Sequence, residues 1–324
     1  MRAIVVDRWM EPSELTVVEI PEPEPGPGQL AIQVRAAGCN FFDILLVQGR
    51  YQVKPPFPFV PGAEIAGEVR AVAPDVSGFA PGDRVLASIP VGGFAEVANA
   101  PASLAHRMPD SMSFEEGAAL PIVYPTAYAA LVLRGDLQPG ETLLVHAAAG
   151  GVGVAAVQIG KALGARVIAT AGGADKVEVA RKAGADVGID YSKEDFVERV
   201  KAETHGRGAD VIFDPVGGDI FDRSLKCIAW NGRLLVIGFA GGEIPSVKAN
   251  RILLKNIAVV GLHWGAYQRY EPERVSEVFE KLFELYEAGR IKPVIFDRYP
   301  LDQVPAALEA LGSRRSHGKV IITP

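Results

Sequence analysis

The sequence predicts an α/β protein in which a doubly wound parallel sheet is inserted into a β-rich domain. Short apolar runs separated by turn signals fill the first third of the chain. Strand and helix patterns then alternate from about Ile122 to about Leu262, and the strand-rich texture returns in the tail. At 324 residues, the chain is long enough for two domains of ordinary size.

The first third consists of short apolar runs bounded by Pro- and Gly-rich turns such as Pro81-Gly82-Asp83. This texture is typical of a small barrel or sandwich. Ser113, followed three residues later by Glu116, forms a capping box that opens a helix. The expected strands are Ala3–Val6, Leu30–Ala36, Ile65–Val72, Arg84–Ser88 and Phe94–Val97.

The central region predicts six apolar strands, most of them joined by crossover helices, and this pattern indicates a parallel sheet covered on both faces. Gly164 and Gly184 stand where helix C-caps are expected. The expected strands are Thr142–Ala147, Arg166–Thr170, Val187–Asp190, Asp210–Phe213, Leu234–Gly238 and Ile257–Gly261. The expected helices are Val152–Leu163, Asp175–Ala183, Lys193–Glu203 and Asp219–Ile228.

After the sheet, apolar residues from Val275 to Tyr286 recur at helical spacing, which predicts a long amphipathic helix that packs on a core. The tail then reads as strand, helix and strand over Val294–Tyr299, Gln303–Leu311 and Lys319–Ile322. Since this texture matches the first third, we expect residues 1–121 and 263–324 to form one domain and residues 122–262 the other.

The composition excludes several classes of protein. Lys and Arg number 33 against 39 Asp and Glu, so the chain lacks the basic footprint of a nucleic-acid binder. Its two cysteines, Cys39 and Cys227, make neither a disulfide framework nor a four-thiolate zinc site. The apolar stretch from Leu143 to Gly160 contains His146 and Gln158 and predicts buried protein, not a membrane span. No targeting motif is evident, so we expect a cytoplasmic protein.

A glycine-rich turn joins the first central strand to its helix, in the run LLVHAAAGGVG from Leu143 to Gly153. Gly150 and Gly153 match the second and third glycines of the dinucleotide-binding fingerprint GxGxxG, and Ala148 replaces the first. The amides at the start of such a helix face the phosphates of a dinucleotide. The predicted contacts in this turn are Ala149, Gly150, Gly151 and Val152. The alternative is a tight turn that binds no ligand.

The end of the second central strand favours NADP(H) over NAD(H). Thr170-Ala171-Gly172-Gly173 carries no acid to hold a ribose 2′-hydroxyl. Lys176 follows, and Tyr191 follows the next strand, so a cation and a donor are available for a 2′-phosphate. We therefore expect Thr170, Gly172, Lys176 and Tyr191 to line the site. Asp175 would repel such a phosphate, and the alternative for Lys176 is an ordinary solvated lysine.

Taken together, these residues resemble the medium-chain dehydrogenase/reductase superfamily, and within it the zinc-free quinone oxidoreductases that include zeta-crystallin. The resemblance covers nearly the whole chain. It implies a Rossmann domain inserted into a barrel-like, GroES-like substrate domain, and a homodimer paired through the sheet edge at Ile257–Gly261. The motifs that carry it are Gly38–Asp43, Pro61–Gly67, Ala147–Gly153, Gly238–Ala240 and Trp264–Tyr267.

The same resemblance implies that no metal is bound. Asn40 stands where zinc-dependent relatives place their first Cys ligand, and Ala63 replaces the His before Glu64. The third ligand position, near Ile122, is apolar, and Ser88–Asn99 holds no cysteine for a structural zinc. Because no Lewis acid would activate an alcohol, we expect reduction of an acceptor that is already electrophilic.

The resemblance places Asn40, Tyr51 and Thr126 around the nicotinamide, with Asn40 and Tyr51 as the expected polarising or positioning groups. Asp43 and Glu64 are expected to brace the site by structural hydrogen bonds, His146 to lie in the core, and His263 to be a candidate proton donor. Further cofactor contacts are implied at Val216, Gly238, Phe239, Ala240, Trp264 and Arg314.

The function expected from these observations is NADPH-dependent hydride transfer to a small quinone or an α,β-unsaturated carbonyl compound. Two alternatives stay open. One is an enoyl-thioester reductase that acts on acyl groups held by CoA or a carrier. The other is a non-catalytic NADPH-binding protein, although the acidic charge balance argues against the RNA binding found in some relatives of zeta-crystallin.

Overall fold

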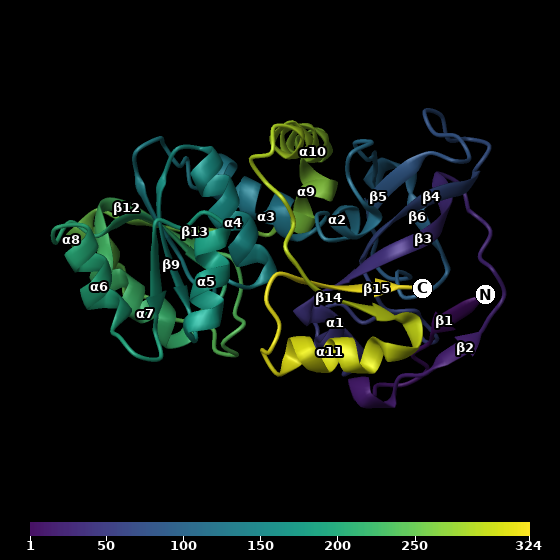
Figure 1. Cartoon of the computed structure of the whole chain (residues 1–324), viewed down its shortest axis with the longest axis horizontal. Coiled ribbons are helices and arrows are strands. Elements are labelled where there is room, and N and C mark those ends of the chain that lie inside the picture. The colour runs from purple at the N-terminus through teal and green to yellow at the C-terminus, as the bar shows by residue number, and fades with distance from the viewer. The chain divides into compact units, whose positions relative to one another are not determined.

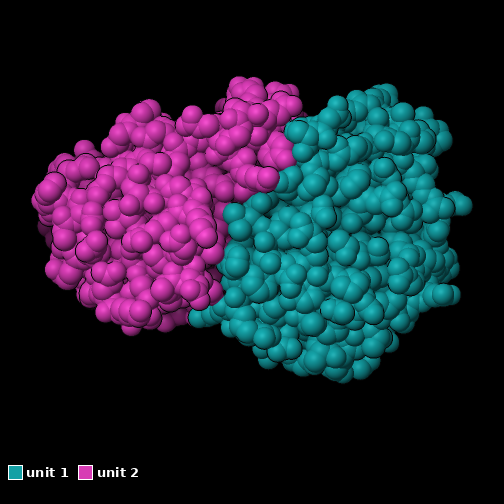
Figure 2. Space-filling view, viewed as in Figure 1, with its two compact units in different colours: residues 1–122, 293–324 teal, residues 123–292 magenta.

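The computed structural model describes residues 1–324. The chain divides into two compact units, which Figure 2 shows in different colours. Unit 1 comprises Met1–Ile122 and Pro293–Pro324, and unit 2 comprises Val123–Lys292. Both ends of the chain therefore belong to unit 1, so unit 2 is an insertion within it.

Unit 1 is built on a mostly antiparallel sheet that both ends of the chain supply. The last strand, β15 (Lys319–Thr323), pairs with β3 (Gln29–Cys39), so that Val320 lies opposite Cys39. The order is β14 (Ile295–Pro300), β15, β3, β4 (Glu64–Val72), β5 (Arg84–Ser88) and β7 (Ala105–Arg107), with β6 (Val97–Pro101) also on β3. A separate ribbon joins β1 (Arg2–Ile4) to β2 (Val17–Glu19). The return of the tail to the β-rich domain is thereby confirmed.

The helices of unit 1 are short and capped. Glu116 N donates to Ser113 Oγ at 3.2 Å and Ser113 N donates to the Glu116 carboxylate at 3.1 Å, which confirms the predicted capping box. The helices are α1 (Phe41–Val47), α2 (Phe114–Ala118) and α11 (Val304–Gly312), with 3-10 turns at Pro12–Glu14, Ala102–Leu104 and Leu301–Gln303. The sequence patterns did not indicate α1.

Unit 2 contains the predicted six-stranded parallel sheet, in the order β10-β9-β8-β11-β12-β13. Its strands are β8 (Thr142–Val145), β9 (Arg166–Ala171), β10 (Val187–Asp190), β11 (Ala209–Asp214), β12 (Ile228–Val236) and β13 (Ala258–Gly261). Figure 1 shows α4 and α5 on one face of this sheet and α6, α7 and α8 on the other. The direction of winding reverses between the neighbouring strands β8 and β11.

The helices of unit 2 follow the predicted pattern, with three short additions. Those expected are α4 (Gly151–Ala162), α5 (Ala174–Lys182), α6 (Phe196–Glu203), α7 (Gly218–Cys227) and α10 (Pro272–Glu287). The additions are α3 (Val123–Tyr128), which continues into a π-helical turn at Ala129–Arg134, α8 (Ala249–Lys255) and α9 (Trp264–Tyr270). Gly164 and Gly184 have φ values of 83° and 116°, as C-cap glycines require. None of the helices combines the length and the apolar character needed to cross a membrane.

The expected domain boundary at residue 263 needs correction. Residues 263–292 group with unit 2, because α10 packs against α3 and α9. Val275, Val278, Phe279 and Leu282 on α10 are all buried, so the amphipathic stripe packs within unit 2. The chain returns to unit 1 only at Pro293.

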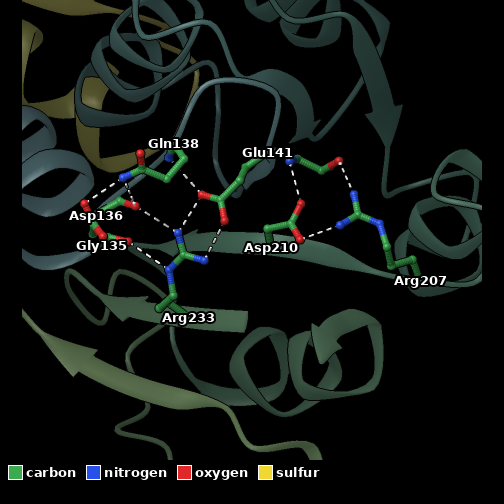
Figure 3. A network of polar contacts seen from close by, with 8 residues as sticks. Gly135, Asp136, Gln138, Glu141, Arg207, Asp210 and Arg233 are labelled. Carbon is green, nitrogen blue, oxygen red and sulfur yellow. Dashed lines mark hydrogen bonds and ion pairs between the residues drawn. The ribbon is translucent and has the colours of Figure 1, made fainter. Parts of the chain in front are cut away.

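A network of ion pairs joins the amino ends of the central strands in unit 2 (Figure 3). Arg233 on β12 donates to both carboxylate oxygens of Glu141, at 2.8 and 2.6 Å, and to the Gly135 carbonyl at 2.9 Å. Asp210 on β11 accepts from the Thr142 amide at 2.8 Å and pairs with Arg207 at 2.6 Å. Burial is the largest single effect on Glu141 and disfavours its charged form, but the hydrogen bonds from Arg233 and the Gln138 amide, together with the positive charge of Arg233, outweigh it, so the pKa of Glu141 lies below its usual value.

Replacing Arg233 by Met should lower the free energy of unfolding at pH 7 by about 2 kcal/mol, the usual range for hydrogen bonds to a charged group. Because the folded pKa of Glu141 is depressed, this stabilisation is present above its unfolded pKa and is lost as the pH falls through the folded value. Urea unfolding at pH 7 and pH 3 measures both. A difference between wild type and Arg233→Met that is as large at pH 3 as at pH 7 would contradict the assignment.

Candidate functional site

The predicted nucleotide contacts of unit 2 converge on one edge of its sheet. Carboxyl ends of parallel strands share an edge, and ligands of such sheets bind there, beside the point where the winding reverses. Most of the contacts lie in segments at or just after those ends: Ala149–Val152 after β8, Thr170 and Gly172 at β9, Tyr191 after β10, Val216 after β11, Gly238–Ala240 after β12 and Trp264 after β13. Thr126 and Lys176 lie on helices instead, Thr126 on α3 and Lys176 in the first turn of α5.

The turn between β8 and α4 brings the backbone of the helix against the end of the strand. Ala147 has a left-handed φ of 48°, and Gly150 N donates to its carbonyl at 2.9 Å. A Cβ on Gly153 would lie 2.3 Å from the Ala147 oxygen, so only glycine permits this approach. A Cβ on Gly150 would contact only that oxygen, at 3.3 Å, so the need for glycine at position 150 is weaker than at position 153.

The first turn of α4 leaves backbone donors for an anion. Its N-cap, Gly150, supplies no side-chain cap, and the first bond back to it comes from Val154 N at 2.8 Å. The amides of Gly151, Val152 and Gly153 therefore have no partner of the i−4 type within the helix. Such donors, together with the helix dipole, suit a phosphate group. The residues of this turn fit the pyrophosphate of a dinucleotide.

Beside that turn, Tyr191 lies directly against Gly172. A Cβ on Gly172 would be 2.8 Å from the Tyr191 hydroxyl oxygen, and Tyr191 N donates to the Ala171 carbonyl at 3.2 Å. Lys176 lies in the first turn of α5, which starts two residues after Gly172. The structure thus places a phenol at the end of β9, next to the helix that carries the cation.

Asp190 is a functional support that the sequence did not single out. One carboxylate oxygen accepts from Gly173 N at 2.9 Å, Ser192 N at 3.1 Å and Ser192 Oγ at 2.6 Å. The Ser192 hydroxyl and the Gly173 amide together lower the pKa of Asp190. Its charge is thereby engaged in holding the loops after β9 and β10. The sequence signal that could have identified Asp190 is an acidic residue at a strand end, followed directly by Tyr191 and Ser192. Asp175, by contrast, is exposed in the first turn of α5.

Thr170 and His146 form a buried polar chain beneath the site. The Ser224 hydroxyl donates to the Ile220 carbonyl at 2.7 Å, so it accepts from His146 Nε2 at 2.8 Å. His146 Nδ1 is then an acceptor, and the Thr170 hydroxyl donates to it at 2.9 Å. Burial lowers the pKa of His146 to about 3, so the ring is neutral. His146 is a core residue, and the Thr170 side chain anchors the end of β9 to it by a buried hydrogen bond.

Two further loops at this edge are tied together through their backbones. Ala240 N donates to the Pro215 carbonyl at 3.0 Å, and Gly241 N donates to the Val216 carbonyl at 2.9 Å. Asp214 accepts from Val216 N at 2.8 Å and from Gly217 N at 3.1 Å. Burial raises the pKa of Asp214 above its usual value, and these two amides partly offset it. The segment from Gly238 to Ala240 is therefore held by the loop after β11.

The remaining predicted residues occupy varied settings. Trp264 is buried at the start of α9 and stacks on Tyr267, with ring centroids 5.3 Å apart. Tyr51 follows α1 in unit 1, and its ring lies 5.4 Å from that of Phe42. Three others occupy surface or partly buried positions: Phe239 is exposed beside Gly217, Thr126 is half-buried on α3, and Arg314 is exposed after α11. His263, the candidate proton donor, is exposed before α9.

Asn40 belongs to a buried charged cluster in unit 1. Its Nδ2 donates to Glu64 Oε1 at 2.8 Å, and its backbone N donates to Asp43 Oδ2 at 2.7 Å. Glu64 Oε2 accepts from the Ile122 amide at 3.0 Å. Asp43 and Glu64 are fully buried and brace Asn40 from both sides.

Lys319 completes this cluster, and the sequence did not single it out. It lies on β15, is 4% exposed, and donates through Nζ to the Cys39 carbonyl and to Asn40 Oδ1, both at 2.8 Å, and to Glu64 Oε1. Burial raises the pKa of Asp43 to about 7, an effect that the Asn40 amide and the Lys319 charge reduce. No local signal could have identified Lys319, because it opens an apolar strand.

Comparison with known proteins agrees with this architecture. Residues 26–110 match the family described as "Alcohol dehydrogenase GroES-like domain", and residues 151–284 match "Zinc-binding dehydrogenase". A quinone oxidoreductase-like protein 2 homolog of Nematostella vectensis is 44% identical over 300 residues, covering 92% of this chain and 82% of that protein. A quinone oxidoreductase of Pseudomonas aeruginosa is 38% identical over 304 residues, covering 93% of each.

Solved structures show the same fold over the full length of the chain. The Escherichia coli quinone oxidoreductase complexed with NADPH matches with a TM-score of 0.92 and 34% identity, over 100% of both chains. The Thermus thermophilus quinone oxidoreductase, solved alone and with NADPH, matches with a TM-score of 0.85 at the same identity, again over 100% of both chains. This chain is therefore an oxidoreductase of the medium-chain dehydrogenase/reductase family. Within that family it belongs to the quinone oxidoreductases.

The description of one matched family implies zinc, and the residues present do not fit it. Ala63 offers no donor, and Asn40 and Glu64 already share the Lys319 ammonium. A second cation cannot occupy the oxygens that this ammonium engages. Within residues 1–324, no group of three or more His, Cys, Asp or Glu side chains is placed to hold a metal ion.

Proposed function

We propose that this protein is a metal-independent reductase that uses NADPH to reduce a quinone or an α,β-unsaturated carbonyl compound. The observation that carries the proposal is the carboxyl edge of the unit 2 sheet, where the open amides of α4 lie near Gly172, Tyr191 and Lys176. When bound, NADPH supplies a hydride from its nicotinamide ring. The chain's own residues bind and orient the reactants.

Two groups of residues divide the binding of the dinucleotide. Gly150, Gly151 and Val152 donate backbone hydrogen bonds to the pyrophosphate, aided by the dipole of α4. Lys176 and Tyr191 hold the 2′-phosphate, for which a cation and a hydroxyl donor are suited. The proposed contacts with the rest of the cofactor come from Asn40, Thr126, Ala149, Thr170, Gly172, Val216, Gly238, Phe239, Ala240, Trp264 and Arg314.

Asn40 and Tyr51 are the proposed donors to the acceptor. Hydride addition to a quinone or an enone places negative charge on the carbonyl oxygen, and donors aimed at that oxygen lower the barrier. An amide and a phenol can supply such hydrogen bonds without a metal ion. The acceptor must therefore be electrophilic in its own right, as quinones and enones are.

The protein is also proposed to form a homodimer through β13. This strand is at the edge of the unit 2 sheet and pairs only with β12, so its other side has no strand partner. Leu253 and Leu254 on the preceding helix are 78% and 71% exposed, which adds apolar area beside that edge.

Replacing Val260 by Lys should convert the dimer to a monomer without unfolding it, since a charge on an edge strand opposes pairing. Light scattering coupled to gel filtration gives the mass, and circular dichroism reports the fold. A wild-type mass near the 34.5 kDa of one chain would refute the dimer.

Replacing Lys176 by Ala should weaken NADPH binding about 10- to 100-fold, the equivalent of one charge-assisted hydrogen bond. NADH binding should change little, since NADH has no 2′-phosphate. Fluorescence titration with each coenzyme measures both constants. Lys182→Ala, an exposed lysine at the other end of the same helix, is the matched control. Equal weakening of both coenzymes would remove Lys176 from the phosphate site.

NADPH oxidation should be fast with a small quinone or a simple enone and unaffected by prior treatment with a chelator. A crotonyl thioester tests the enoyl-thioester alternative in the same assay. A clear preference for the thioester would reassign the substrate class. Tight NADPH binding with no turnover of any of the three would instead favour a non-catalytic protein.

A further inference from the structure

Lys319 is a buried lysine in unit 1, where its charge cannot contribute to the solubility of the chain. Lys319 is 4% exposed, and Glu64, which it pairs with, is fully buried. The groups that face the ammonium are the Glu64 carboxylate, the Asn40 amide oxygen and the Cys39 carbonyl, with Asp43 close enough for its pKa to respond to the charge. A buried ion pair is costly unless its remaining hydrogen bonds are satisfied.

For Glu64, the remaining hydrogen bonds of this buried ion pair are satisfied. Its Oε1 accepts from Lys319 and Asn40, and its Oε2 accepts from the Ile122 amide. Gly38 makes room for it, because a Cβ there would lie 2.4 Å from Glu64 Oε1 and 2.6 Å from the Ala118 carbonyl. The backbone is thus shaped around a carboxylate whose positive partner comes from the far end of the chain.

The cluster also determines which way the Asn40 amide faces. An ammonium only donates, so the Asn40 atom that contacts Lys319 must be the oxygen. A carboxylate only accepts, so the atom that contacts Glu64 must be the nitrogen. Both partners exclude the flipped amide. Of the two N–H groups on Nδ2, one is used by Glu64 and the other is left without a partner within the cluster.

We propose that Lys319 is a positioning residue that locks the Asn40 amide, so that the second N–H of Asn40 is presented to the oxygen of the bound acceptor. The inference rests on the proposed function, in which Asn40 donates to that oxygen. Lys319 neutralises Glu64 and holds the oxygen end of the amide at the same time. Charge neutralisation alone would need no contact with Asn40, so the two roles can be separated by mutation.

Two variants separate neutralisation of Glu64 from orientation of the Asn40 amide: Lys319→Met and the double variant Lys319→Met/Glu64→Gln. The single variant leaves a buried carboxylate without its cation, so we expect a large loss of stability. The double variant restores neutrality and should recover folding and NADPH affinity. Because the glutamine in this variant has one acceptor oxygen where Glu64 accepts from both Asn40 and Ile122, the reference for the double variant is Glu64→Gln alone, which keeps Lys319. The kcat of the double variant should be about tenfold below that of Glu64→Gln with KM nearly unchanged, because a donor that acts mainly in the transition state is misplaced.

Arg70→Met, which removes an exposed ion pair with Glu22 in the same unit, is the matched control and should behave as wild type. A double variant with the kcat of Glu64→Gln would overturn the inference and leave Lys319 with charge neutralisation alone. If wild type reduces none of the acceptors, the proposed function fails. The positioning role is then tested by whether the side-chain amide of Asn40 is held in one orientation.

Whether the Asn40 side-chain amide is fixed can be measured without turnover. The chain has only five asparagines, which are Asn40, Asn99, Asn231, Asn250 and Asn256. Protein labelled with 15N at asparagine gives five side-chain amide pairs, and Asn40→Ser identifies one. In wild type we expect one Asn40 proton to be protected from exchange with water and the other to exchange faster. The double variant should lose this difference. If that variant does not fold, the wild-type spectrum decides: equal, fast exchange of both protons overturns the inference.

Discussion

The arrangement of unit 2 depends on one close contact, between the backbone of α4 at Gly153 and the carbonyl of Ala147. A side chain at that position would push the helix away from the strand. Because the helix begins so close to β8, its unpaired amides stand at the carboxyl edge of the sheet, among the turns after β9, β11 and β12. Backbone donors in a fixed place need no side chain to bind an anion.

Unit 1 depends on a different constraint, because it buries two carboxyl groups, those of Glu64 and Asp43. Glu64 pairs with an ammonium on β15, and burial raises the pKa of Asp43 to about 7. Lys319 is held in position by its three contacts, and an ammonium group cannot coordinate a substrate oxygen as a metal ion would. The acceptor must then be polarised by neutral donors, which agrees with a reductase for electrophilic carbonyl compounds.

Much of the fold was predictable because its signals are local. The capping box at Ser113, the C-cap glycines and the apolar strands each depend on a few neighbouring residues. For the nucleotide half of the candidate site, one turn carries the fingerprint. For the other half, the resemblance indicated Asn40 with Asp43 and Glu64 as its braces, and the structure joins these three by hydrogen bonds. The Lys319 contact with Glu64 joins residues 255 positions apart, and the local spacing of apolar and polar residues in the sequence does not indicate such a contact. The assignment of residues 263–292 failed for the same reason, since the amphipathic pattern of α10 identifies a buried face but not its partner.

The central claim is that the dinucleotide alone supplies the reducing power in a site without a metal. The most direct test gives chelator-treated protein NADPH that carries deuterium at the transferred position, with a simple enone as the acceptor. The account predicts one deuterium at the β-carbon of the product for each NADPH consumed, with no metal added. Product without deuterium, or turnover that returns only when a metal ion is supplied, would contradict it.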